Sequence, residues 1–227
     1  MVPKTCSPAS AIYSAALTVS ATTTIKALAA AGGYSNSAVT SATYTISTSG
    51  SAGTSPVSLA AAFNVYAIGT NGAPVTNGGL DTWGFAYSSN LLGSTVTWSG
   101  VTFNLGTAGT ASGVSNATIA LPAVNSSKLN LLAASVNGSH ANQTFVLTYT
   151  DGTTTTLTQS VSDWYTAQNY TGESIAVTMA YRINQYGVID THVTDVYGYS
   201  FAIDSTKTVK SLQLPGSRNV VVLAAAL

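Results

Sequence analysis

Charged side chains are scarce in this chain. Only 6% of its 227 residues are Asp, Glu, Lys or Arg, against about 25% in ordinary soluble domains. Seven basic and seven acidic residues cancel at neutral pH. No basic stripe suited to nucleic acid and no cationic patch suited to an anionic membrane is present. We therefore expect neither nucleic acid nor a membrane as a partner.

Cysteine and long apolar runs are also lacking. The single cysteine, Cys6, excludes an intramolecular disulfide. No apolar run approaches the roughly 20 residues of a membrane span, and the opening MVPKTCSPAS has no signal-peptide apolar region. Ser, Thr, Asn and Gly must solvate the surface instead, which is common in secreted bacterial modules and suits neutral, hydroxyl-rich ligands. We expect a secreted protein whose export signal was removed or which is part of a longer chain.

The strongest local pattern lies between Gln143 and Tyr165, where two alternating runs flank Asp151-Gly152. This dipeptide is a strong hairpin signal. A two-residue loop would set each apolar face against a polar one. A three-residue loop with Gly152 left-handed pairs Phe145 with Leu157. Because a one-residue slip inverts every side chain, the apolar pattern selects the longer, bulged loop.

Further strand patterns recur about every ten residues, with turn residues between them and no convincing helix. This pattern predicts an all-β protein, an antiparallel β-sandwich or jelly roll. The last nine residues, NVVVLAAAL, lack alternation, so we expect a strand buried on both faces. The other expected strands span 57–68, 95–98, 101–105, 117–121, 128–136, 173–181, 193–203 and 208–214.

The chain divides at a Gly/Ser/Thr linker over 48–56, which follows three short expected strands at 12–20, 22–30 and 37–46. Residues 12–46, IYSAALTVSATTTIKALAAAGGYSNSAVTSATYTI, resemble the C-terminal half of the small Ig-like domain at the end of chitobiase and many secreted bacterial hydrolases. The resemblance implies that 1–47 is a partial Ig-like segment, a truncated spacer without the family's opening strands.

Residues 57–227 resemble a different family. The resemblance is carried by FNVYAIGTNG, GGLDTWGFAYSSNLLG, VTWSGVTFNLG, NQTFVLTYTDGT, SDWYTAQNYTGES, VYGYSFAI and NVVVLAAAL. These phrases are similar to an accessory domain of secreted bacterial glycoside hydrolases and phosphoesterases, especially acidobacterial ones. The resemblance implies a galactose-binding-like β-sandwich, of the kind used by many carbohydrate-binding modules, next to a linked catalytic domain.

The richest cluster of candidate binding residues follows the central hairpin. Sugar sites combine flat aromatic faces with planar polar groups that bind adjacent hydroxyls. Besides the predicted ligand-binding residues named at the end of this paragraph, the cluster contains Gln168 and Tyr181. In the alternative reading Trp164 plugs the end of the sandwich and Arg182 pairs with Asp163 or Glu173. The predicted ligand-binding residues are Asp163, Trp164, Tyr165, Asn169, Tyr170, Glu173, Arg182 and Tyr186.

Two weaker patterns lie upstream. Trp83, Phe85 and Tyr87 alternate beside Asp81, which predicts one strand face, either core or a glycan platform. The loop that contains Asn77 and Asp81 could hold a structural Ca²⁺, although a plain turn explains it as well.

Enzymatic motifs are sparse. The sequence has no G-x-S-x-G elbow, no phosphate-binding loop and no zinc-spaced Cys/His set. The leading hypothesis is a non-catalytic accessory module that binds neutral carbohydrate. The alternatives are a purely structural spacer or adhesion module, and a glycoside or phosphoester hydrolase that uses Asp163 and Glu173.

Overall fold

The computed structural model describes residues 7, 10–14, 23–44 and 55–227. The chain forms two compact units, Met1–Ser51 and Ala52–Leu227. Cys6 and the expected linker up to residue 54 lie outside the described residues.

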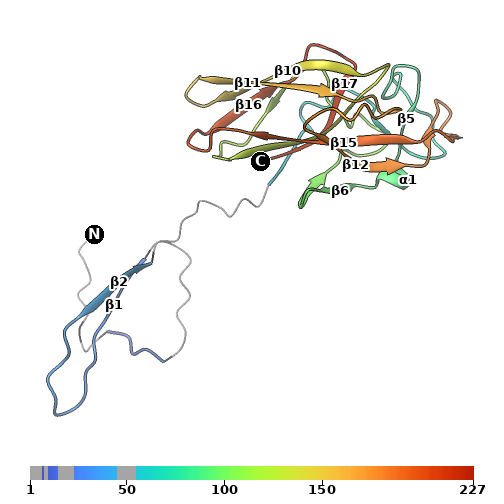
Figure 1. The fold of residues 1–227 in the computed structure, drawn as a ribbon. Coiled ribbons are helices and arrows are strands. Elements are labelled where there is room, and N and C mark those ends of the chain that lie inside the picture. Colours follow the sequence, from blue (N-terminus) through green and yellow to red (C-terminus); the bar gives the residue numbers. More distant parts are fainter. Residues whose placement is uncertain (1–6, 8–9, 15–22, 45–54) are drawn as a thin grey trace. The chain divides into compact units, whose positions relative to one another are not determined.

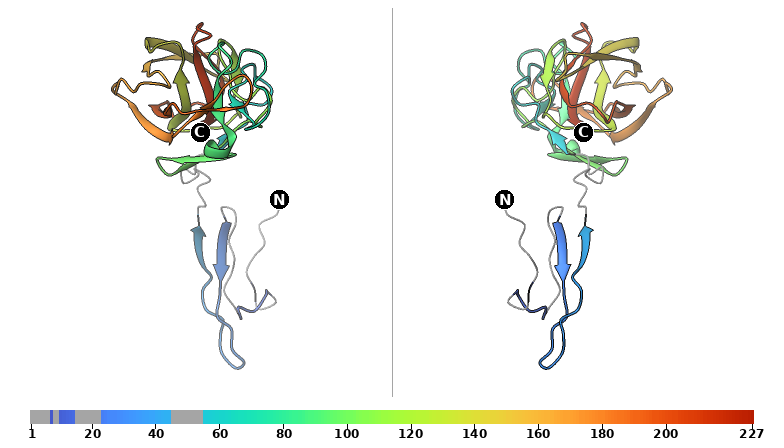
Figure 2. Two further views of the ribbon diagram at one scale, coloured as in Figure 1. Left: turned by 90° about the vertical axis from the view of Figure 1, so that its right-hand side faces the viewer. Right: turned by 90° about the vertical axis from the view of Figure 1, so that its left-hand side faces the viewer.

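The described part of the first unit contains two antiparallel strands, β1 (Thr23–Ala27) and β2 (Thr40–Tyr44). Ile25 lies opposite Ala42 in their register, and Figure 2 draws the pair as a blue ribbon. Within the described residues of this unit, none is buried, and a two-stranded ribbon alone is marginally stable. The first of the three expected strands falls largely on residues 15–20, which are outside the described residues; its described start at Ile12 is not in a strand.

The second unit is a β-sandwich, which confirms the predicted fold class. All strand pairs within its two main sheets are antiparallel, and Figure 1 shows the sheets as two layers. The four-stranded sheet has the order β11-β10-β16-β8, with bounds Thr154–Val161, His140–Tyr149, Val209–Gln213 and Thr118–Ala120. The five-stranded sheet has the order β12-β15-β9-β17-β3, with bounds Glu173–Met179, Thr194–Ala202, Lys128–Ser135, Val220–Ala226 and Pro56–Val57.

The central hairpin, β10 and β11, has the predicted register. Phe145 lies opposite Leu157, and Gly152 adopts φ +84° in the turn. Both apolar residues are buried. The bulged loop therefore places the apolar faces of the two strands together, as the pattern required.

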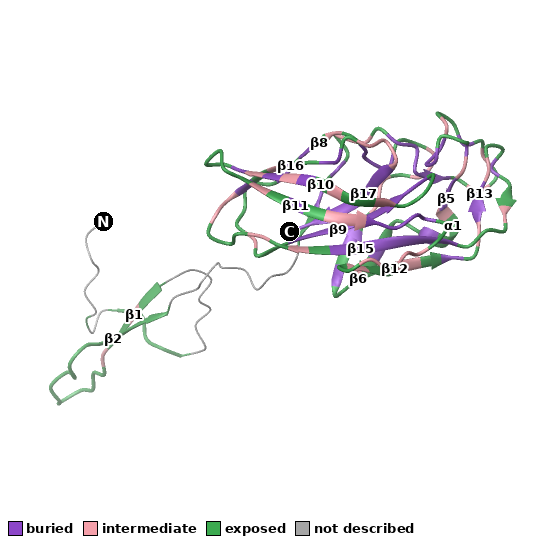
Figure 3. Ribbon diagram, turned by 45° about the horizontal axis from the view of Figure 1, so that its top comes forward, coloured by how far each residue is buried: buried purple, intermediate pink, exposed green. Residues whose placement is uncertain are grey.

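The last strand, β17, is buried along its whole length, as expected from its unbroken apolar run. Figure 3 colours buried residues purple, and this colour also runs along β9, the neighbour of β17 in the sheet. A hairpin of β6 (Thr95–Trp98) and β7 (Val101–Asn104) contacts this sheet and contributes to its cover. Trp98 packs directly on Gly198 of β15, where a side chain would overlap the indole ring.

A smaller sheet has the order β14-β13-β5-β4, with bounds Ile189–Asp190, Arg182–Ile183, Ala86–Ser88 and Ile68–Gly69. The predicted strand over 57–68 is wrong, because the chain turns at 60–62 and pairs again only from Val65. The predicted shared face of Trp83, Phe85 and Tyr87 is also wrong: Trp83 is exposed, Tyr87 is buried, and β5 starts at Ala86.

Helix is nearly absent from the described residues. The helix α1 (Ser89–Leu92) is a single turn after β5. No helix in the described part of the chain is long and apolar enough to cross a membrane.

Candidate functional site

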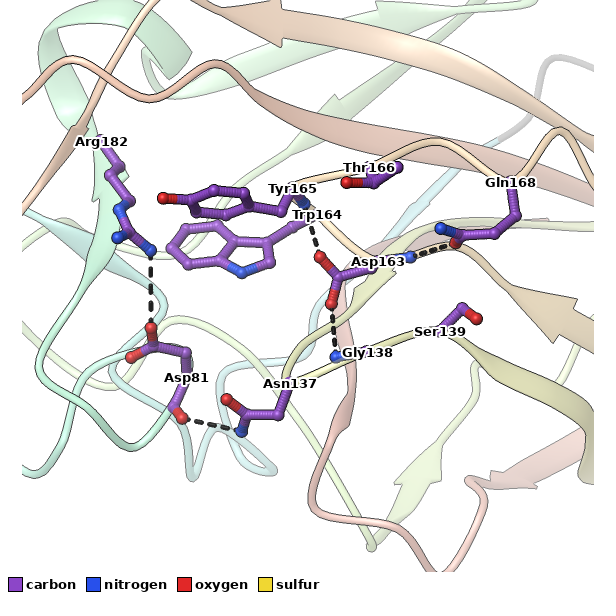
Figure 4. A pocket seen from close by; sticks show the side chains of 10 residues that line it. All are labelled: Asp81, Asn137, Gly138, Ser139, Asp163, Trp164, Tyr165, Thr166, Gln168 and Arg182. Atoms are coloured by element: carbon purple, nitrogen blue, oxygen red, sulfur yellow. Dashed lines mark hydrogen bonds and ion pairs between the residues drawn. The ribbon is translucent and has the colours of Figure 1, made fainter.

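A cavity of about 450 Å³ lies among the loops around the small sheet. Figure 4 shows Arg182 and Asp163 at opposite ends of the ring pair formed by Trp164 and Tyr165. The cavity is lined by Asp81, Asn137, Gly138, Ser139, Asp163, Trp164, Tyr165, Thr166, Gln168 and Arg182.

Asp163 enters the cavity because the chain leaves β11 along the end of β9. Ser135 of β9 donates its amide to the carbonyl of Ser162 and accepts the amide of Trp164. The carboxylate of Asp163 then accepts the amides of Gly138 at 2.7 Å and Tyr165 at 2.8 Å. These bonds fix an acceptor group at the cavity wall, and Asp163 is 8% exposed.

Trp164 and Tyr165 have different roles. Trp164 is 2% exposed, and its ring meets the Tyr87 ring edge to face at 5.3 Å. Such packing makes Trp164 part of the core beneath the cavity rather than an exposed stacking platform. Tyr165 is 37% exposed and therefore presents part of its ring to solvent.

Arg182 is the main cation at this site, and its partners differ from the predicted Asp163 and Glu173. Its Nε donates to Asp190 at 2.9 Å, and its Nη1 lies 3.7 Å from the Asp81 carboxylate. The guanidinium also lies 3.5 Å from the centroid of the Phe85 ring and 4.6 Å from that of Tyr165. These contacts hold Arg182 between two aromatic rings and two carboxylates.

The pKa values of the two carboxylates beside Arg182 are shifted in opposite directions. Burial raises the pKa of Asp81, despite the amides of Trp83 and Phe85 and the nearby guanidinium. Burial acts to raise the pKa of Asp190 as well, but bonds from His192 and Arg182 outweigh it and lower that pKa. The ion pair with Asp190 is therefore the one that the fold stabilises.

Glu173 is a structural anchor of the loop that precedes β12. Its carboxylate accepts the amide of Tyr170 at 2.7 Å, the hydroxyl of Tyr199 at 3.1 Å and the amide and hydroxyl of Ser162. Burial, then the charge of Glu173, raises the pKa of Tyr199 well above its ordinary value. Glu173 is not among the residues that line the cavity, so this geometry does not support an acid pair with Asp163.

The remaining predicted binding residues lie away from the cavity lining. Tyr170 donates its hydroxyl to Ser139, which does line it. Asn169 occupies an exposed left-handed position, with φ +55°. Tyr186 is 70% exposed in the turn after β13.

The suggested calcium loop has a donor set that does not fit the ion. One oxygen of Asp81 accepts the amides of Trp83 and Phe85, and the other faces Arg182. Asn77 is exposed with φ +54°. No group of three or more His, Cys, Asp or Glu residues that could hold a metal occurs among the described residues.

Four cavity residues were missing from the candidate set: Asn137, Gly138, Ser139 and Thr166. Asn137-Gly138 is a turn dipeptide directly after the apolar run of β9, and that signal could have placed it at the sandwich rim. Gln168 belonged to the cluster noted in the sequence. Asp81 lines the cavity as a polar wall residue rather than as a metal ligand.

Comparison with known families supports the architecture. A family model described as an AziU2-like beta-sandwich domain matches residues 53–227. The chain belongs to the AziU2-like β-sandwich family. A second model, described as Fn3 associated, matches residues 3–44, and a comparison with curated proteins gives no match. In this AziU2-like sandwich, the cavity lies wholly within the matched region.

Proposed function

We propose that the β-sandwich is a non-catalytic accessory module that binds neutral carbohydrate in the cavity around Asp163 and Tyr165. The observation that carries the proposal is that the partly exposed Tyr165 ring borders the same cavity as the polar groups of Asp163 and Gln168. The cavity volume of about 450 Å³ falls within the usual range for small-molecule sites.

Several polar groups in the cavity are available to hydroxyl groups. Within the described residues, Gln168 Nε2 and Thr166 Oγ1 have no hydrogen-bond partner, whereas Gln168 Oε1 accepts the amide of Asp163. Each carboxylate oxygen of Asp163 accepts one backbone amide and keeps a further lone pair. The part of the Tyr165 ring left exposed beside the Arg182 guanidinium at 4.6 Å and the His192 ring at 5.0 Å supplies an apolar surface for the C–H side of a sugar ring.

The charges favour a neutral ligand. The lining contains two carboxylates, Asp81 and Asp163, and one guanidinium, Arg182. Because Arg182 already faces Asp81 and Asp190, an anionic ligand would meet net negative charge. Uronic acids and sulfated glycans are therefore disfavoured relative to neutral sugars.

The module would act for a linked catalytic domain of a secreted bacterial hydrolase. Tethering raises the effective concentration of a substrate-bearing surface near the enzyme, so weak binding suffices. The low charge content supports this role, and the proposal takes the sandwich to be an accessory domain of the galactose-binding-like kind. In the same proposal, the first unit is a chitobiase-type Ig-like spacer.

Calorimetric titration with a panel of neutral oligosaccharides tests the proposal. Tyr165→Leu should weaken binding about tenfold and Thr166→Val about three- to tenfold, as expected for losing one stacking contact or one hydrogen bond. Tyr34→Leu and Thr156→Val remove the same groups from exposed positions elsewhere and should leave affinity unchanged. Absence of binding by the folded wild-type protein across the panel would reject the carbohydrate role.

A structural spacer is the second candidate, favoured by the burial of Trp164 at 2% exposure. The hydrogen bonds by which Glu173 fixes its own loop also favour a structural role. In that case the cavity is a by-product of loop packing. In that case the wild type would bind no oligosaccharide of the panel, and substitutions in the cavity would affect only the stability of the fold.

A further inference from the structure

Trp83 presents a large exposed indole beside the cavity, although it is not among the residues that line it. The residue is 73% exposed. Its Nε1 donates to Asn137 Oδ1 at 3.0 Å, so the one polar atom of the ring is already bonded within the protein. The exposed surface of the ring is therefore apolar and flat.

The loop that carries Trp83 is held from several sides. The amide of Trp83 donates to Asp81 Oδ1 at 2.9 Å. Arg218 donates from Nη1 to the carbonyl of Leu80 at 3.1 Å and from Nη2 to that of Gly79 at 3.2 Å. A ligand that stacks on this ring would have little loop motion to arrest, which lowers the entropic cost of binding.

The conformation of the loop also depends on Gly84. This residue has φ +90°, and a Cβ there would lie 2.8 Å from the Cβ of Gln185. The amide of Gly84 donates to the carbonyl of Gly78 at 2.9 Å. The lack of a side chain at Gly84 therefore lets the segment after Trp83 lie against the turn between β13 and β14.

Trp83 contacts two residues of the cavity wall. Its amide bonds Asp81 and its indole bonds Asn137, and both of these residues line the cavity. Asn137 also donates from Nδ2 to the carbonyl of Asp81 at 2.9 Å. Trp83 is therefore attached to the cavity wall at Asp81 and Asn137, so a ligand longer than a single sugar that leaves the cavity on this side would meet the indole.

We propose that Trp83 forms a second subsite of the same binding site. One unit of a neutral saccharide chain occupies the cavity, and an adjacent unit stacks on the exposed face of Trp83. This inference rests on the proposed function and specifies its ligand class: oligosaccharides of two or more neutral units, rather than monosaccharides or anionic glycans.

The test is calorimetric titration of the full chain with gluco-, manno-, xylo- and galacto-oligosaccharides of one, two and four units. The wild type should bind the four-unit member of its preferred series about tenfold more tightly than the single sugar. Trp83→Ala should remove that gain and leave single-sugar affinity within about twofold. Trp83→Phe, which keeps a ring but loses the bond to Asn137, should retain most of the gain.

The outcomes separate the two proposals. Equal affinity for one and four units, or equal loss at every length in Trp83→Ala, overturns the second subsite and leaves the cavity as a binding site. A loss in Trp83→Phe as large as in Trp83→Ala also overturns it, because the bond to Asn137 would then be the cause. If the wild type binds no member of any series, the proposed function itself fails. Tyr34→Ala, at an exposed tyrosine of the first unit, is the matched control.

Discussion

The indole ring of Trp98 lies against Gly198 on strand β15, at a position where a Cβ would overlap the ring. Trp98 also donates from Nε1 to Ser174 Oγ at 2.9 Å. This contact fastens the β6–β7 hairpin to the five-stranded sheet. It therefore joins two segments that are far apart in the sequence.

Gly198→Ala should lower the free energy of unfolding by about 1–3 kcal/mol, because the methyl group displaces Trp98 from the sheet. Chemical denaturation measures the change. The control is Gly216→Ala, at an exposed glycine where an added Cβ would have its nearest neighbour 3.9 Å away, with an expected change within about 0.5 kcal/mol. Adding Trp98→Ala should cost less in the Gly198→Ala background than in the wild type. Full additivity would contradict the contact.

Arg182→Met should lower the free energy of unfolding by about 3 kcal/mol, because it removes the cation that the carboxylates of Asp81 and Asp190 share. The side chains of Arg182 and Asp81 are 10% and 6% exposed. Urea denaturation at neutral pH gives the value. Lys210→Met, at an exposed position, is the control and should change stability little. A similar small effect for Arg182→Met would show that the ion pairs do not stabilise the fold.

Stability should depend on pH through Asp190, whose pKa is lowered in the fold by bonds from His192 and Arg182 that outweigh burial. A lowered pKa gives stability that is present above the ordinary Asp value of about 3.9 and is lost as pH falls through the folded pKa. The advantage of the wild type over Asp190→Asn should therefore shrink between about pH 5 and pH 2.

Asp81 provides a contrast of opposite sign, since burial raises its pKa. The stability that Asp81 contributes is present below the ordinary Asp pKa, and it is lost as pH rises through the pKa that Asp81 has in the folded protein. Asp81→Asn should compare more favourably with the wild type as pH increases. The same trend in both variants, measured by denaturation across this pH range, would contradict the assigned directions.

Glu173→Gln should loosen the loop over 162–172, because an amide group replaces one oxygen that now accepts hydrogen bonds. A loss of about 1–3 kcal/mol is expected for unsatisfied buried partners. Hydrogen exchange should show faster exchange at the Tyr170 amide. Gln143→Glu, at a half-buried position of β10, should leave that amide unaffected. Unchanged exchange at Tyr170 in Glu173→Gln would show that the carboxylate does not hold the loop.

Local patterns predicted the framework well. The register of Phe145 with Leu157 follows from alternation and one turn dipeptide, and all of these residues belong to one hairpin. The unbroken run of β17 likewise indicated burial on both faces. In each case the residues that decide the structure lie within one hairpin or one strand.

The site was predicted less completely because its contacts join distant segments. Arg182 pairs with Asp81, about a hundred positions upstream, and with Asp190, and no periodic pattern connects these residues. Trp164 belongs to a polar-aromatic segment, yet its contact with Tyr87 buries it. Tertiary packing decides which aromatic of a cluster stays exposed, and the sequence pattern does not contain that information.

The most direct test of the central claim is an amide chemical-shift titration of the isotope-labelled chain with neutral oligosaccharides. The account predicts saturable shifts concentrated at Asn137, Gly138 and Ser139 and at residues 165–168, with weaker shifts near Trp83 for longer chains. Saturable shifts confined to another face of the sandwich, or no shift with any neutral sugar, would contradict it.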